Sequence, residues 1–165
     1  MLKIEKRMGL IMLKLQTLED TNRLASAIGA VALAGDNLVL TGDLGTGKTT
    51  LTKGIAKSLG IHRTIKSPTY TIIREYLEGR IPLYHMDVYR VENGASDLGL
   101  DEYFEGDGLC VIEWGNLLQE ALPLDYLELT FKRTEETEQA RELTFSAHGK
   151  RASDFQKRIL ERWSA

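Results

Sequence analysis

The residues best suited to chemistry lie together in one glycine-rich stretch. It reads Gly42-Asp43-Leu44-Gly45-Thr46-Gly47-Lys48-Thr49-Thr50, and its first eight residues match the phosphate-loop pattern G-x-x-x-x-G-K-[ST] at every required position. Gly45 and Gly47 have no Cβ, so the backbone can approach an anion closely and direct successive N–H groups toward it. We expect the Lys48 ammonium to reach the β- and γ-phosphates of a nucleotide and the Thr49 hydroxyl to hold Mg²⁺.

A carboxylate that could complete such a site is Glu113. It ends an apolar run at residues 109–112, which is typical of a central strand in a parallel sheet. An acid at the end of the strand beside a phosphate loop normally contacts Mg²⁺ or its waters. That acid is usually an aspartate, so the glutamate is a departure. We predict that Glu113 is the second Mg²⁺ ligand, and the alternative is a strand-end carboxylate exposed to solvent.

A polar strand face is predicted at residues 85–90, which read His-Met-Asp-Val-Tyr-Arg. Side chains alternate between the two faces of a strand, so His85, Asp87 and Tyr89 share one face. This face could line the γ-phosphate, with Asp87 as the base or the group that orients a water molecule. His85 fits either the same role or that of a hydrogen-bonded structural residue.

Three further side chains are candidates beside the nucleotide. Ser67 and Thr69 place hydroxyls on a loop after the phosphate-loop helix, where such groups sense the γ-phosphate in nucleotide switches. Turn chemistry alone explains them equally well. Trp114, next to Glu113, is either a core residue or an aromatic surface beside the nucleotide.

Length, charge and composition indicate a single-domain protein that does not span a membrane. The chain has 165 residues, which suggests one domain, and a net charge of −3, which argues against bulk electrostatic binding of nucleic acid. The single cysteine, Cys110, lies in the apolar run and favours a buried structural thiol in a reducing compartment. No apolar stretch reaches the length of a membrane span. We therefore expect a cytoplasmic protein with no membrane association.

The elements next to the phosphate loop fit a strand–loop–helix unit. Residues 38–40 are predicted as a strand, and residues 50–59 as a helix whose Leu51, Ile55 and Leu59 share one face. An earlier helix opens at Thr17, with Asp20 in a near capping-box position. We expect it to end at Gly35, and the phosphate-loop helix at Gly60.

The remaining elements alternate in a way that predicts a mixed sheet. Residues 70–77 and 81–90 read as a β-hairpin and residues 126–132 and 142–147 as a second pair of strands. Helices are predicted at 96–104, 116–122 and 151–163, and a strand at 13–16. The fold class that follows is α/β, a single P-loop NTPase domain with a mixed central sheet flanked by helices. We assign it to residues 13–165, with residues 1–12 as an N-terminal extension.

Four motifs in this order resemble the TsaE family, small bacterial ATPases of tRNA threonylcarbamoyladenosine synthesis. They are the phosphate loop at residues 42–50, Ser67-Pro68-Thr69-Tyr70, the segment at residues 85–90, and Ile112-Glu113-Trp114. The resemblance covers about residues 13–149. After Trp114 the chain has Gly115 where the commoner form has proline.

The resemblance implies a function and a set of site residues. Members of the family bind a TsaB–TsaD pair, which transfers the threonylcarbamoyl group to tRNA, and hydrolyse ATP to support its turnover, so contact with tRNA is indirect. Carried over residue by residue, Lys48 is a phosphate ligand, Thr49 and Glu113 are Mg²⁺ ligands, and Asp87 is a catalytic-site acid. Trp114 belongs to the same site and Leu18 to a nucleotide contact; Lys132, Arg133 and Arg141 are further candidates for nucleotide contact.

Two other functions fit the residues. One is a P-loop kinase of a small metabolite, with Asp87 as its base, and the other is a non-catalytic module whose interactions depend on nucleotide. No Asn-Lys-x-Asp quartet marks guanine specificity, so ATP is the expected nucleotide. No arginine finger is evident, with Arg74 and Arg90 candidates only by proximity, so we expect slow hydrolysis that partners stimulate.

Overall fold

Four parallel strands form the centre of the sheet in the computed structural model, which describes residues 4–7, 9–43, 45–66, 68, 72–88, 99–114, 118 and 121–165. Their order across the sheet is β7 (Tyr126–Arg133), β3 (Asn37–Thr41), β6 (Leu109–Glu113) and β5 (Leu83–Asp87). Residues 38–40 of β3 and 109–112 of β6 are apolar and fully buried, as expected for strands of a parallel sheet covered on both faces. The predicted strands at 38–40 and 109–112 and their parallel pairing are confirmed.

The carboxyl ends of these strands meet at one edge of the sheet. Asp87 ends β5 and stands in register with Glu113 at the end of β6. Glu113 in turn is in register with Leu40 of β3, two residues before the phosphate loop begins at Gly42. Open α/β sheets bind their ligands outside the carboxyl ends of the strands, so this topology alone brings the predicted site residues together.

Antiparallel strands extend the sheet on both sides. On one side β7 pairs with β8 (Arg141–His148), β8 with β2 (Leu10–Leu15), and β2 with β1 (Ile4–Arg7); on the other side β5 pairs with β4 (Ile73–Tyr76). Both predicted hairpins are confirmed. In the described part of the chain the sheet has eight strands, with β1 and β4 outermost.

The amino-terminal residues differ from the prediction. We expected a first strand at 13–16 and an extension before it, but β2 begins at Leu10 and β1 adds a further strand. Leu13 and Leu15 alternate into the core, and their strand pairs with β8, more than 120 residues away in the chain. A pairing over that sequence distance cannot be inferred from a local pattern, so the position of β2 in the sheet could not be predicted.

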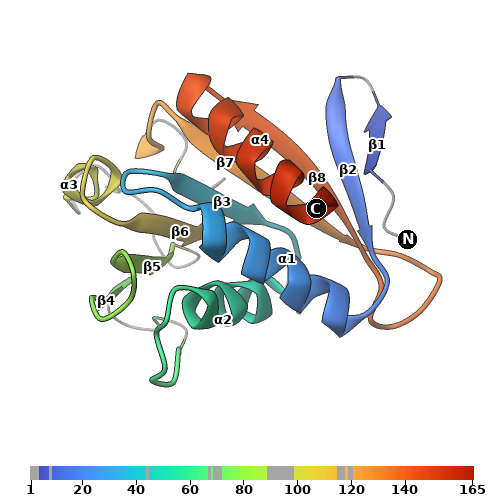
Figure 1. Cartoon of the computed structure of the whole chain (residues 1–165), viewed down its shortest axis with the longest axis horizontal. Helices are drawn as coiled ribbons and strands as arrows, with labels where there is room; N and C mark the ends of the chain where they lie inside the picture. The colour runs from blue at the N-terminus through green and yellow to red at the C-terminus, as the bar shows by residue number, and fades with distance from the viewer. Residues whose placement is uncertain are drawn as a thin grey trace.

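Three helices in the described part of the chain form a layer on one face of the sheet (Figure 1). The helices α1 (Leu18–Val31), α2 (Lys48–Ser58) and α4 (Lys150–Ser164) share one core with one face of the sheet. The short α3 (Asp101–Phe104) helps to cover the other face. Along β3 this alternation is visible in single residues, because Leu38 and Leu40 belong to the first core and Val39 to the second. The predicted fold class, a mixed sheet flanked by helices, is confirmed.

The helix α1 begins as predicted and ends earlier than predicted. Thr17 accepts from the Asp20 N–H and the Asp20 carboxylate accepts from the Thr17 N–H, which completes the capping box. The helix ends at Val31 rather than at Gly35, because Ala32 is extended and the Asp36 carboxylate accepts from the Leu33 N–H at 2.8 Å.

The other helix predictions have mixed outcomes. The helices predicted at 50–59 and 151–163 are confirmed, and Gly60 follows α2 with a φ of 89°. The prediction at 96–104 falls partly, and that at 116–122 mostly, on residues that are not described. None of the helices in the described ranges combines the length and the apolar composition that a membrane span requires.

Candidate nucleotide-binding site

The turn between β3 and α2 has the backbone geometry of an anion cradle. Gly47 precedes the first residue of α2 with a φ of 110°, and Gly45 has a φ of 73°. Side chains with a Cβ rarely adopt these angles, so glycine is needed at both positions. The N–H groups in the first turn of α2 have no partners within the helix, and the helix dipole adds positive potential there. This end of α2 is therefore suited to a phosphate group.

The ammonium of Lys48 is held inside this turn. Its Nζ donates to the carbonyl oxygens of Gly42 at 2.6 Å and Asp43 at 2.9 Å and lies 4.0 Å from the centre of the Trp114 ring. Burial lowers the pKa of Lys48 from its ordinary value of 10.5, although the nearby carboxylates of Glu113, Asp87 and Asp43 oppose that shift. The carbonyl contacts of Lys48 therefore hold its ammonium charge next to the anion cradle.

Trp114 itself has an unusual backbone. Its φ is 63°, and its N–H donates to the Leu40 carbonyl at 3.0 Å. A non-glycine residue with positive φ marks a local constraint. The ring packs against the smaller core cluster and also lines the cleft. Both interpretations of this tryptophan, as a core residue and as a surface beside the ligand, therefore describe part of its position.

Oxygen atoms suited to Mg²⁺ converge beside the cradle. The Thr49 hydroxyl donates to Glu113 Oε1 at 3.0 Å, and Asp87 lines the same cleft. Mg²⁺ prefers such oxygen donors and usually takes only one or two protein ligands, with waters and phosphate oxygens filling the rest of its shell. Among the described residues, no group of three or more acidic, histidine or cysteine side chains is arranged to hold a metal ion by itself. The donor set fits a cation bound together with a nucleotide.

These groups line a single cleft of about 520 Å³ at the carboxyl edge of the sheet. Such a volume is in the range of small-molecule and cofactor sites. The residues that line it are Leu18, Thr21, Gly45, Thr46, Gly47, Lys48, Thr49, Thr50, Asp87, Glu113, Trp114, Glu138, Gln139 and Arg141.

His85, predicted on the face toward the γ-phosphate, is fully buried and absent from the cleft lining. Apart from it and the basic residues of the β7–β8 hairpin, the predicted site residues fall into three groups. Most of them line the cleft, including Leu18, which lies far from the others in sequence. Gly42 and Asp43 lie behind the cradle and accept from Lys48. Leu44, Ser67, Thr69 and Tyr89 lie outside the described residues.

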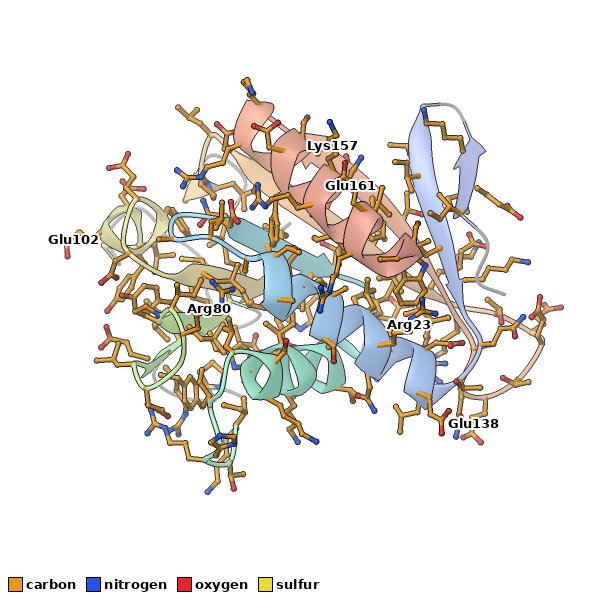
Figure 2. All side chains as sticks on the ribbon, viewed as in Figure 1. Arg23, Arg80, Glu102, Glu138, Lys157 and Glu161 are labelled. Atoms are coloured by element: carbon orange, nitrogen blue, oxygen red, sulfur yellow. The ribbon has the colours of Figure 1, made fainter. Side chains whose placement is uncertain are left out.

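The connection between β7 and β8 forms the other wall of the cleft. Arg133 donates to the Gly45 carbonyl at 2.8 Å, and Arg141 Nε donates to the Thr46 carbonyl at 2.8 Å. The Gln139 side chain accepts from the Leu18 N–H at 3.4 Å. Figure 2 shows Glu138 beside the amino-terminal end of α1. Of the three basic candidates on this hairpin, Arg141 lines the cleft, Arg133 braces the loop, and Lys132 is absent from the lining.

The sequence did not indicate Thr21, Glu138 or Gln139 as part of the site. Thr21 is one helical turn after Leu18, so an α1 helix that contacts the nucleotide through Leu18 would bring it along. Glu138 and Gln139 lie in a polar turn that no sequence pattern connects with α1. The contact of His85 with Glu113 was also not predicted.

Comparisons with known proteins agree on one family. The model of the family "Threonylcarbamoyl adenosine biosynthesis protein TsaE" matches residues 15–143. A relative from Bacillus subtilis, named tRNA threonylcarbamoyladenosine biosynthesis protein TsaE, is 54% identical over 133 residues, which are 81% of this chain and 83% of the relative. A relative of the same name from Nostoc is 41% identical over 131 residues, 76% of this chain and 80% of the relative.

A solved structure is similar over nearly the whole chain. It is the crystal structure of YdiB from Bacillus subtilis, with a TM-score of 0.80 and 42% sequence identity over 98% of this chain and 97% of that one. The similarity includes the strands β1 and β2, since these lie within the covered length.

Proposed function

Since the chain belongs to the TsaE family, we propose that it binds and hydrolyses ATP with Mg²⁺ in this cleft to support tRNA threonylcarbamoyladenosine biosynthesis. The proposed partner is a TsaB–TsaD complex, which would carry out the transfer itself and contact the tRNA. On this proposal the protein works in the cytoplasm, where tRNA is modified.

One observation carries the ATPase part of the proposal. Lys48, Thr49, Asp87 and Glu113 come from three different elements and line one cleft at the amino-terminal end of α2. Cation, hydroxyl and carboxylate groups in this arrangement serve phosphoryl transfer, in which catalysis depends on positioning and on charge stabilisation. If the glycine-rich turn had only a structural role, no carboxylates would be expected beside it, whereas Asp87 and Glu113 both line the cleft.

Each residue has a proposed role. The N–H groups at the start of α2 and the Lys48 ammonium would bind the phosphates, after Lys48 exchanges its two carbonyl partners for phosphate oxygens. Thr49 and Glu113 would hold Mg²⁺, which supplies charge neutralisation on the phosphate oxygens when bound. Asp87 would orient the attacking water or accept its proton.

The arginine in the cleft supports dependence on a partner. Among the described lining residues, Arg141 is the one arginine, and its guanidinium donates to the carbonyls of Thr46, Glu138 and Ala140. A guanidinium committed to three carbonyls is poorly placed to stabilise the charge of the transferred phosphoryl group. Supplying such a charge from a partner raises turnover by roughly 10³–10⁵ in other P-loop enzymes.

Phosphate release measured with and without purified TsaB–TsaD tests the proposal. We expect slow release by the isolated protein, acceleration by the complex, and loss of release in both Lys48→Ala and Glu113→Ala. Calorimetry should separate the two variants, because Lys48→Ala loses nucleotide affinity whereas Glu113→Ala retains most of it.

Equal release with and without TsaB–TsaD would contradict the proposed partnership. A phosphorylated metabolite formed without the complex would instead favour the metabolite kinase. Tight nucleotide binding with no phosphate release, even with the complex present, would favour a non-catalytic module.

A further inference from the structure

The imidazole of His85 lies directly against the carboxylate proposed to bind Mg²⁺. His85 Nε2 and Glu113 Oε2 are 2.5 Å apart, and the two side chains are 0% and 3% exposed. The other carboxylate oxygen, Oε1, accepts from the Thr49 hydroxyl. Both oxygens of Glu113 therefore have a fixed partner, one at the cleft and one behind it.

The strand register explains how His85 reaches this position. The strands β5 and β6 are parallel neighbours, with His85 opposite Val111 and Asp87 opposite Glu113. Side chains two residues apart share a face, so His85 and Asp87 both lie on the face toward the Glu113 side chain. Asp87 lines the cleft, while His85, two residues before it, is fully buried.

The environment of the second ring nitrogen indicates the tautomer. His85 Nδ1 is buried and has no hydrogen-bond partner among the described residues. A buried N–H donor without a partner is costlier and rarer than an acceptor without one. The proton is therefore best placed on Nε2, from which it is donated to Glu113.

The contact with His85 restricts the orientation of the Glu113 side chain. An aspartate is the usual acid at this position of P-loop enzymes, and a glutamate has one more rotatable bond. Holding a longer carboxylate in one orientation costs side-chain entropy, unless neighbouring groups already restrict it. In metal sites, a residue that hydrogen-bonds to a ligating carboxylate fixes the orientation of that carboxylate.

We propose that His85 is a positioning residue that orients Glu113 for Mg²⁺ bound together with a nucleotide. This inference rests on the proposed function, because it assumes that Glu113 is a Mg²⁺ ligand. It assigns His85 a role in metal affinity and none in contact with the nucleotide.

The test measures how strongly Mg²⁺ tightens ADP binding, by calorimetry with Mg²⁺ and with EDTA. His85→Asn removes the reach of Nε2, because an asparagine amide nitrogen corresponds in position to Nδ1, and His85→Leu removes the donor at similar volume. His85→Gln is the matched control, since its amide nitrogen corresponds in position to Nε2. We expect the Asn and Leu variants to lose about 10- to 100-fold of the Mg²⁺ effect and the Gln variant to retain most of it.

A double-mutant cycle shows whether His85 acts through Glu113. With Glu113→Ala as the background, His85→Asn should cause no further loss, because the carboxylate that it orients is gone. Affinity for ADP in EDTA should be the same in the parent and in all His85 variants. Thermal unfolding without nucleotide identifies any variant that does not fold, and the cycle is then made with the other variant.

Several results would overturn the inference. These are an unchanged Mg²⁺ effect in His85→Asn or His85→Leu, an equal loss in His85→Gln, and a loss of ADP affinity in EDTA as large as that in Mg²⁺. A parent protein that binds ADP with no effect of Mg²⁺ would instead contradict the proposed function itself.

Discussion

Among the single residues, Lys48 carries the charge that would meet an anion in the cleft. Its ammonium is buried among the carbonyl oxygens of its own loop and the ring of Trp114. Burial lowers its pKa below the ordinary 10.5, whereas contact with phosphate oxygens would raise the pKa again. On the proposed function, nucleotide binding and protonation of Lys48 would therefore be coupled.

This coupling predicts that the affinity for Mg²⁺–ADP falls as the pH rises toward 10.5. The free protein begins to lose the Lys48 proton at a pH below that value, and binding must then take the proton up again. At lower pH, where Lys48 is charged in both states, no uptake on its account is expected. Calorimetry at about pH 9, in buffers with different ionisation enthalpies, measures the number of protons taken up.

An arginine variant provides the control for this measurement. Lys48→Arg keeps its charge throughout the range, because a guanidinium has a pKa above about 12. It should bind Mg²⁺–ADP without alkaline proton uptake, whatever its absolute affinity. Uptake of the same size in Lys48→Arg and the parent would show that another group is responsible.

Among the elements, the β7–β8 hairpin, which forms the other wall of the cleft, supports the phosphate loop. The guanidinium groups of Arg133 and Arg141 donate to the carbonyls of Gly45 and Thr46, and Arg141 also lines the cleft. A peptide whose carbonyl is held outward directs its N–H inward, toward the cradle. The hairpin thereby helps to set the direction of the donors that would bind an anion.

Removing one of these braces should weaken nucleotide binding moderately. Arg133→Ala is expected to raise the dissociation constant for Mg²⁺–ADP about two- to fivefold, because an exposed charged hydrogen bond contributes up to about 1 kcal/mol. The preceding residue gives the matched control: Lys132 points to the other face of β7 and is absent from the cleft lining. Lys132→Ala should leave the dissociation constant unchanged, and an equal effect of both variants would point to general loss of positive charge.

Elements that are determined by residues close together in the sequence were predicted correctly. The phosphate loop fixes its own strand and helix, and the Thr17–Asp20 pair fixes the start of α1. The pairing of β2 with β8 and the contact between Gln139 and Leu18 join residues more than 120 positions apart, for which a single sequence has no signal. The proposed role of His85 could be inferred only from the register of β5 against β6. The alternation of side chains in the sequence predicts the face on which His85 lies, but not the residue beside it.

At the scale of the whole molecule, Cys110 reports on the integrity of the sheet. It lies in the central strand β6, is fully buried, and donates to the Tyr103 carbonyl at 3.2 Å. Burial raises the pKa of its thiol to about 12, so little reactive thiolate forms at neutral pH. This agrees with the prediction of a buried structural thiol.

We expect an aromatic disulfide reagent to label Cys110 only when the sheet opens. Mg²⁺–ADP at about 100 times its dissociation constant should slow labelling roughly a hundredfold, because it binds the folded protein alone and adds about 2.7 kcal/mol to its stability. The rate is followed by absorbance. Lys48→Ala should lose this protection, and labelling of the parent as fast as a free thiol would contradict the buried position.

The outermost strands of the sheet affect whether copies of the chain associate edge to edge. Both β1 and β4 are only four residues long, and each carries neighbouring opposite charges, Glu5 and Lys6 in β1 and Arg74 and Glu75 in β4. A border strand presents backbone groups that can recruit a strand from another chain, and short, charged strands are poor templates for this. In the described part of the sheet, both borders therefore resist the strand-to-strand stacking that leads an open sheet into fibrils.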